Sequence, residues 1–288
     1  MHTESTLKKI LKAQRNEITE SLIYTKLSNS EKNPKNKKIL VAIAHDEMRH
    51  YEIWKKQTGK DIKPNMFFVW YYYIISKILG LTFGLKLMEM GENQAVTLYN
   101  SIIKDVPEAK NVLHDEEAHE QKLITMIHEE KLEYIGSIVL GLSDALVEFT
   151  GMLAGLTFAL QNSKLIALAG IVAGIAASFS MAASEYLSSK ADGNANPIRA
   201  AIYTGMTYII TVIFLVLPYF LSSNVYFALA TTIFTAILII FMFTFYTSVA
   251  KDLPFKKRFF EMTLISLGVA GISFCVGYLV RTVLGINI

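Results

Sequence analysis

Five long apolar segments in the second half of the chain constrain its fold most strongly. Each offers about twenty mostly apolar residues, and they cover roughly 134–160, 165–188, 199–222, 225–249 and 259–282. A helix of about twenty residues crosses the roughly 30 Å of hydrocarbon in a bilayer. Nearly all acidic and lysine residues lie before residue 134 or in short loops. The sequence therefore predicts an all-α chain, with a soluble domain at residues 1–132 and a membrane domain of five transmembrane helices at residues 133–288.

The charged loops between these segments predict their orientation. Lys190 and Arg199 lie between the second and third segments, and the loop before the fifth holds Lys251, Lys256, Lys257 and Arg258. The opposite loops carry only Lys164. Because positively charged loops stay on the cytoplasmic side, we expect the N-terminal domain in the cytoplasm and the C-terminus outside. The net charge of +3, without a basic stripe interleaved with aromatic residues, predicts no nucleic-acid partner.

One further apolar segment is ambiguous. It begins at Met66 with a run of aromatic residues and continues through Lys77 and Lys86 to Leu87. The two lysines argue against a sixth span, because a charged side chain in hydrocarbon is costly. We expect an interfacial or dimer-forming helix that leads into the third helix of the soluble domain, and a transmembrane helix is the alternative.

The soluble domain carries the pattern His-Asp-Glu-x-x-His twice. Each copy contains a glutamate and a histidine three residues apart: Glu47 and His50 in the first, Glu116 and His119 in the second. On an α-helix, residues three apart lie about 60° apart around the axis and roughly 4.5 Å along it. Both side chains of a pair can therefore bind one metal ion, and the repeated pair predicts a two-metal site.

Two upstream glutamates extend the repeat. Glu17 lies seven residues before Tyr24, and Glu92 lies seven residues before Tyr99. Seven residues make about two helical turns, so each glutamate shares a face with its tyrosine. We expect the tyrosines to be buried packing residues whose hydroxyls reach partners around the metal site. The first histidine of each pattern, His45 or His114, points elsewhere on its helix and is expected at the surface.

This order of residues resembles rubrerythrin-like members of the ferritin-like superfamily, over about residues 5–132. The resemblance implies a four-helix bundle whose side chains bind two metal ions. The implied ligands are Glu17, Glu47, His50, Glu92, Glu116 and His119. Three glutamates lie one turn from these positions and remain as alternative ligands: Glu20, Glu89 and Glu120.

The donor set also predicts the metal. Carboxylates with a minority of imidazoles suit iron or manganese, and we expect iron first, with manganese as the alternative. Cys275 is the only cysteine, so the chain has no Cys-x-x-Cys iron site. It departs here from full rubrerythrins, which carry a rubredoxin-like centre for electron delivery.

The first two apolar segments contain acidic residues. Asp144 and Glu148 lie four residues apart in the first, and Met181 and Glu185 lie four apart in the second, so each pair shares a helix face. Carboxylates at membrane depth normally face a protein interior or an aqueous path. Small residues nearby predict that the two segments pack closely around an ion route. They are Gly151, Gly155, Gly170, Gly174, Ala176, Ala177 and Ser178.

Over residues 134–288 the chain resembles the vacuolar iron transporter family. Residues 180–186 match the family's Ser-Met-x-x-x-Glu-Tyr pattern in the second span, and Asp144 matches its first-span aspartate. Ala145 stands where the family often has glycine, and residues 188–198 are too few for the acidic insertion of plant-type members. The joined layout resembles bacterial membrane-bound ferritins, in which a ferritin-like domain would replace that insertion.

These resemblances imply a transporter that exports Fe²⁺ or Mn²⁺ from the cytoplasm, with protons as the counter-ion and a homodimer as the assembly. Asp144, Glu148, Met181 and Glu185 are the expected transport pathway, and no catalytic residue is predicted. Ferroxidase activity of the soluble domain stays open. The alternatives are a membrane-anchored di-iron oxidase or peroxidase, and a metal sensor or store without turnover.

Overall fold

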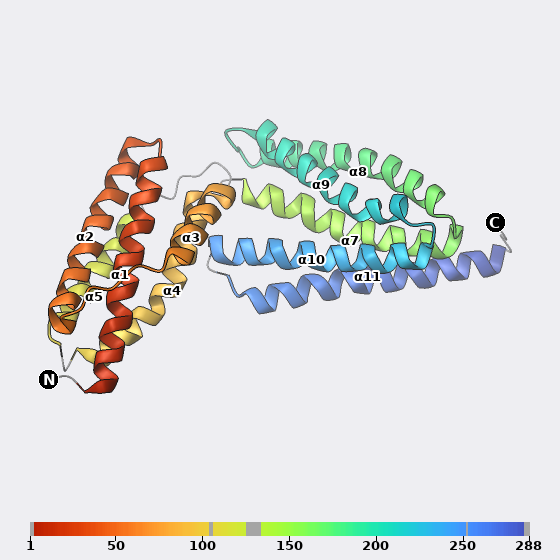
Figure 1. Cartoon of the computed structure of the whole chain (residues 1–288). Helices are drawn as coiled ribbons and strands as arrows, with labels where there is room; N and C mark the ends of the chain where they lie inside the picture. Colours follow the sequence, from red (N-terminus) through yellow and green to blue (C-terminus); the bar gives the residue numbers. More distant parts are fainter. Residues whose placement is uncertain (1–2, 104–105, 125–133, 252, 285–288) are drawn as a thin grey trace. The chain divides into compact units, whose positions relative to one another are not determined.

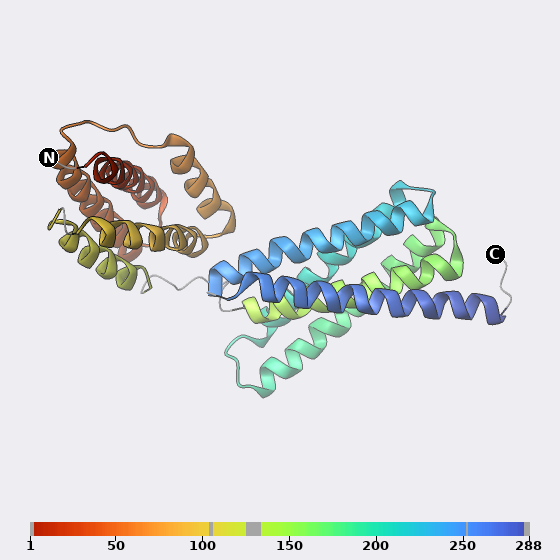
Figure 2. The ribbon, with the colours of Figure 1, turned by 90° about the horizontal axis from the view of Figure 1, so that it is seen from below.

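A computed structural model describes residues 3–103, 106–124, 134–251 and 253–284. Every regular element within these ranges is an α-helix. The chain divides into two compact units, Met1–Glu129 and Glu130–Ile288, which are described separately below (Figures 1 and 2).

The N-terminal unit holds five described helices. They are α1 (Glu4–Ser30), α2 (Pro34–Thr58), α3 (Met66–Leu79), α4 (Leu81–Ile102) and α5 (Ala109–Ile124). Side-chain caps mark the starts of the first two: Thr3 accepts from the backbone of Thr6, and Asn33 precedes a proline in the first turn of α2. Gly59 ends α2 in the left-handed conformation, with φ of 65°.

Helix contacts in this unit form a ring. α1 packs on α2, α2 on α5, α5 on α4 and α4 on α1, while α3 lies against α1 and α4. Apolar residues fill the ring in two buried clusters. One contains Tyr24 and Leu40, and the other contains Trp54 and Tyr99. The ring thus leaves the middle of α1, α2 and α5 to surround a group of polar side chains.

The ambiguous aromatic segment is α3. Its 14 residues would extend only about 21 Å as a helix, too short to cross a bilayer. The structure therefore agrees with the expectation that this segment is not a sixth span. A single glycine, Gly80, separates α3 from α4, which is the helix that carries Glu92 in the sequence.

The C-terminal unit holds the five apolar helices expected from the sequence. They are α7 (Ile135–Leu160), α8 (Ser163–Ala191), α9 (Pro197–Leu221), α10 (Val225–Lys251) and α11 (Phe255–Leu284). All five are long and apolar enough to span a membrane. The prediction of five long apolar helices is confirmed, and the helix ends fall close to the predicted segment ends.

Small residues in α7 and α8 allow close packing with more than one neighbouring helix. Gly151 and Gly155 of α7 face Val269 and Ser273 of α11. An added Cβ at Gly170 of α8 would lie 3.0 Å from Val216 of α9 and 3.4 Å from Leu153 of α7. α7 packs mainly along α11 and α9, and α8 along α9. The small residues of α8 thus lie against the first span as predicted, and those of α7 lie against α11.

Candidate functional site

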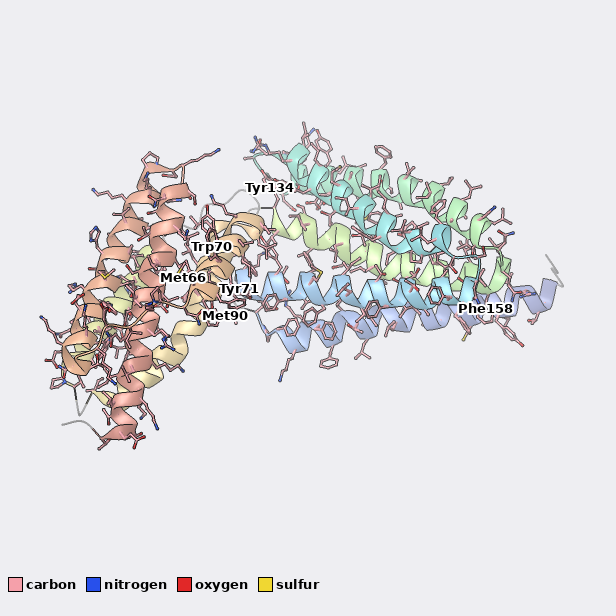
Figure 3. All side chains as sticks on the ribbon, in the orientation of Figure 1. Met66, Trp70, Tyr71, Met90, Tyr134 and Phe158 are labelled. Carbon is pink, nitrogen blue, oxygen red and sulfur yellow. The ribbon has the colours of Figure 1, made fainter. Side chains whose placement is uncertain are left out.

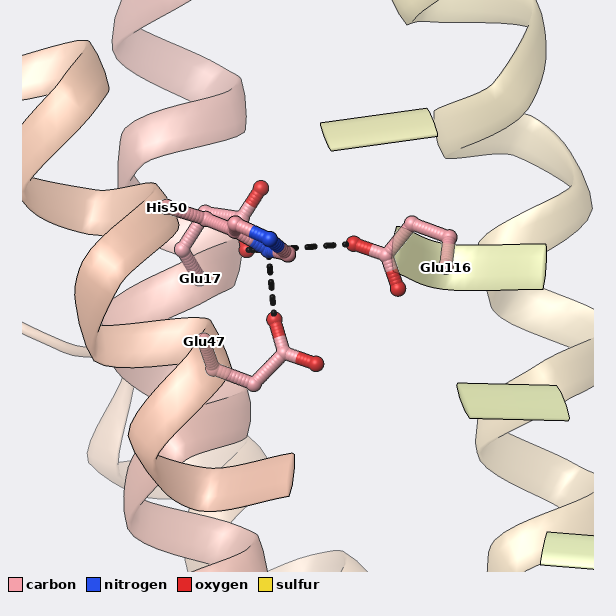
Figure 4. A group of neighbouring side chains, drawn as sticks. All are labelled: Glu17, Glu47, His50 and Glu116. Atoms are coloured by element: carbon pink, nitrogen blue, oxygen red, sulfur yellow. Dashed lines mark ion pairs between the residues drawn. The ribbon is translucent and has the colours of Figure 1, made fainter. Parts of the chain in front are cut away.

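Three helices of the N-terminal unit bring five acidic and imidazole side chains together. Glu17 comes from α1, Glu47 and His50 from α2, and Glu116 and His119 from α5. Four of the five are almost fully buried, and the Glu116 side chain is 11% exposed. Ligand atoms of Glu17, Glu47, His50 and Glu116 all lie within 4.8 Å of one another (Figure 4). This buried cluster could hold a metal ion.

The two imidazoles contact the same two carboxylates. Nδ1 of His50 lies 3.4 Å from Oε2 of Glu17 and 3.6 Å from both Oε2 of Glu47 and Oε1 of Glu116. Nδ1 of His119 lies 3.2 Å from Oε1 of Glu47 and 3.5 Å from Oε2 of Glu116. Glu47 and Glu116 therefore each present one oxygen to each histidine.

The aspartates of the two repeated patterns hold the histidines reciprocally. Nε2 of His50 lies 3.2 Å from Asp115 on α5, and Nε2 of His119 lies 3.0 Å from Asp46 on α2. Arg49 donates to both aspartates, at 2.9 and 3.0 Å. In the neutral form of each imidazole, a carboxylate at Nε2 favours the tautomer that carries its proton there, and the Nδ1 lone pair would then face a bound cation.

Two hydrogen bonds also hold the Glu17 carboxylate in place. Its Oε1 accepts hydrogen bonds from Nε1 of Trp54 at 3.0 Å and from the Tyr99 hydroxyl at 2.5 Å. The two rings stack with centroids 5.6 Å apart. These contacts turn Oε2 of Glu17 toward His50, and the expected hydroxyl contact of Tyr99 at the site is confirmed.

Several buried atoms of the cluster have no hydrogen-bond partner. They are Oε2 of Glu17, both carboxylate oxygens of Glu47, and Nδ1 of His50 and of His119. Leaving such groups buried and unpaired is costly. A bound cation would satisfy all five atoms, so these residues fit a metal by geometry and by donor chemistry.

Charge within the cluster shifts the ionisation of its members. Burial, followed by the charge of Glu116, raises the pKa of Glu47 to about 8. Burial alone would lower the pKa of His119, but the carboxylates of Glu116 and Glu47 outweigh it and raise the pKa to about 10. The same competition raises the pKa of His50 well above its usual range. The cluster thus holds protons that a metal ion would displace.

The other residues predicted as ligands or as their neighbours are not part of this cluster as the structure describes it. The side chains of Glu92 and Glu120 lie outside the described residues. Glu20 lines a separate cavity of about 170 Å³ between α1, α3 and α4, and Glu89 is half-buried on α4. As expected, the outer histidines are exposed; the His114 side chain is 84% accessible.

Sequence reasoning did not assign roles to Asp46, Asp115, Arg49 or Trp54. The aspartates carried a usable signal, because in each copy of the repeat an aspartate immediately precedes the candidate ligand glutamate. The position of Trp54 was a signal too, since it lies four residues after His50 and so faces the same side of α2.

Two of the acidic residues in the C-terminal unit contact hydroxyl groups on neighbouring helices. Glu148 accepts from the hydroxyl of Tyr208 on α9 at 2.5 Å. Glu185 accepts from Ser137, in the first turn of α7, at 2.6 Å. Asp144 is partly exposed, and Met181 packs against the apolar core. Within the described residues, no hydrogen bond or ion pair joins the α7 acids to Met181 or Glu185.

Comparison with known proteins identifies the C-terminal half. The model of the VIT family matches residues 135–195 and 190–278, which together span half of the chain and include α7 to α10 and most of α11. No curated protein matches the chain. The match agrees with the resemblance to vacuolar iron transporters carried by Asp144 and residues 180–186. The chain therefore belongs to the VIT family, through its five apolar helices.

Proposed function

We propose that this protein exports Fe²⁺ or Mn²⁺ across a membrane, and that its N-terminal unit collects the metal first. Membership of the VIT family indicates a membrane transporter of iron or manganese. The observation that carries the finer proposal is the buried Glu/His cluster, whose unpaired donor atoms occur in the same chain as the five membrane helices.

The ring of α1, α2, α5 and α4 would be a ferritin-like bundle that binds two metal ions. Glu17 and His50 would hold the first ion, and His119 would hold the second with Glu92, the ligand predicted from the sequence. Glu47 and Glu116 would bridge both ions. Oxygen and imidazole donors favour iron or manganese over softer metals.

The membrane route would use carboxylates at two depths of the C-terminal unit. Asp144 and Glu148 lie near the middle of α7, whereas Glu185 lies near the end of α8 that meets the start of α7. This end also carries the basic loops, so the positive-inside rule makes it cytoplasmic. Metal ions would enter past Glu185 and Met181 and then reach Asp144 and Glu148.

Protons are the proposed counter-ion. A carboxylate binds a divalent cation in its ionised form, so protonation on the far side would release the metal. We further propose that two copies of the chain pair through the membrane unit, as the resemblance to vacuolar iron transporters implies.

Metal flux into proteoliposomes tests the function. Wild-type protein with its N-terminal unit outside should take up Fe²⁺ or Mn²⁺ and release protons from the lumen. Asp144→Asn should lower uptake to the level of empty vesicles, because it removes a charge at mid-span. Asp192→Asn, at an exposed position just after α8, is the matched control and should transport normally.

Two results would contradict the proposal. Wild-type vesicles that show no flux for either metal would exclude transport. Oxidation of Fe²⁺ on the outer face without uptake would instead favour the anchored oxidase.

A further inference from the structure

The outward face of α3 is a continuous strip of large apolar and aromatic side chains. Phe67, Trp70, Tyr71, Ile74 and Ile78 follow helical spacing on one side, and each is at least 40% exposed. Phe67 and Ile78 are the most exposed, at 71% and 68%. The opposite side packs into the N-terminal unit through Val69 and Ser76. Trp70 and Tyr71 are labelled on α3 in Figure 3. We refer to the five exposed residues as the α3 strip.

Basic residues are frequent in the sequence around the α3 strip, and one of them contacts it. Between Asp61 and Glu89 the sequence contains no acidic residue and three lysines, Lys63, Lys77 and Lys86. Lys26, on α1, places its ammonium group 4.0 Å from the centroid of the Trp70 ring. Tryptophan, tyrosine and lysine together are typical of side chains at a membrane–water interface.

We propose that the α3 strip lies in the headgroup region of a bilayer that contains anionic lipids. The five membrane helices keep a bilayer close: ten residues separate Ile124, the end of α5, from Ile135. Ten extended residues reach at most about 36 Å, so the bilayer is present at high effective concentration. Apolar side chains would enter the boundary with the acyl chains, and the lysines would contact lipid phosphates.

Charge favours lipid over a second copy of the chain. In a symmetric pair the same surface meets itself, so the lysines around one α3 strip would approach those of the other. Like charges at an interface are unfavourable, whereas anionic headgroups complement them. Docking would hold the N-terminal unit in one orientation on the membrane. This inference is independent of the proposed metal chemistry.

Tryptophan fluorescence of the full chain tests the docking, because the chain has only two tryptophans. Trp70 is 48% exposed on the strip, and Trp54 is fully buried beside Glu17. The protein is reconstituted in vesicles of phosphatidylcholine and phosphatidylglycerol whose acyl chains carry bromine at defined depths. The emission that wild type has and Trp70→Phe lacks belongs to Trp70, and the remaining emission is the internal control.

Bromine near the glycerol backbone should quench the Trp70 emission more than bromine near the chain ends, and should leave Trp54 unchanged. Vesicles of phosphatidylcholine alone, or the Lys63→Gln/Lys77→Gln variant, should show less quenching. Strongest quenching from the chain ends would mean a membrane-inserted helix and overturn interfacial docking. Quenching only by aqueous iodide would mean that the strip is exposed to water. Protection from both bromine and iodide would mean that protein covers the strip. Either result overturns the proposal.

Discussion

The two acidic regions of this molecule differ in how their carboxylates are grouped. In the N-terminal unit, three glutamates and two histidines converge in one buried cluster, and a second set of side chains fixes their orientation. In the C-terminal unit, Glu148 and Glu185 each meet hydroxyl groups at separate places. Many converging donors favour tight binding, whereas a few separated donors permit entry and release. Under the proposed function, the cluster would hold metal and the separated acids would pass it on.

The largest expected effect comes from Glu47, because its two oxygens face both histidines. Glu47→Gln removes the negative charge and replaces one carboxylate oxygen with an NH2 group that cannot bind a cation, so we expect both proposed metal ions to be lost on dialysis. The affinity loss should exceed the roughly 10–100-fold typical of residues that only orient a ligand. Elemental analysis of the purified chain measures the metal content.

Glu52→Gln is the matched control for this experiment, since Glu52 lies on the same helix with a side chain that is 54% exposed. It should retain the wild-type metal content. Retention of both ions in Glu47→Gln would show that the cluster is not the metal site.

Metal removal should make the stability of the N-terminal unit depend on pH. In the metal-free folded chain the pKa of Glu47 is about 8, whereas its reference value, used for the unfolded chain, is 4.5. Between pH 4.5 and 8 the folded chain therefore binds one more proton than the unfolded chain. For His119 the corresponding pKa values are about 10 and 6.5. Between about pH 6.5 and 8 the unfolded chain has lost both protons while the folded chain still binds them, so stability should fall as pH rises, by up to about 1.4 kcal/mol per proton and pH unit.

The metal-loaded protein has already released these protons and should lack this trend. The difference in Tm between loaded and metal-free protein should therefore widen from pH 6.5 to 8. Emission of Trp54, buried beside Glu17, follows unfolding of this unit; the Trp70→Phe background isolates its signal. The pKa of Glu17 is lowered, so Glu17 adds a contribution to stability that stays constant across this pH range. A metal-free Tm that rises with pH would refute the ionisation assignment.

The reciprocal aspartates should have an intermediate effect. Asp115→Asn and Asp46→Asn leave every proposed ligand in place but remove the negative charge at Nε2 of His50 and His119, respectively. Each should weaken metal binding by about 10–100-fold. Isothermal titration of the metal-free chain measures this loss. Glu117→Gln, exposed on the same helix as Asp115, should bind as wild type does; equal affinity in all three variants would exclude the orienting role.

Much of this comparison could be predicted from local sequence. The length of the apolar segments alone predicts the five spans. A glutamate three residues before a histidine is a local property of one helix, so both Glu-x-x-His pairs could be predicted as well. The crossing of Asp46 to His119 and of Asp115 to His50 could not be derived, because it depends on how α2 and α5 pack. The partners of the small residues in α7 and α8 were also out of reach, since spacing shows that a helix can approach closely but not which helix it approaches.

The smallest expected effect comes from Tyr208, which donates one hydrogen bond to Glu148. Tyr208→Phe keeps the ring that packs edge-on against Phe149 and removes only the hydroxyl. Loss of one such bond to a charged group is worth about 1.5–3 kcal/mol at most, and only the part that differs between the metal-free and metal-bound states affects flux. We expect a several-fold change in metal flux, without any change in the metal content of the N-terminal unit. Tyr226→Phe removes a hydroxyl that contacts Gln161 at the helix ends and should leave flux unchanged. If Tyr208→Phe instead removed metal from the Glu/His cluster while sparing flux, the division of the molecule into a holding site and a passing route would be wrong.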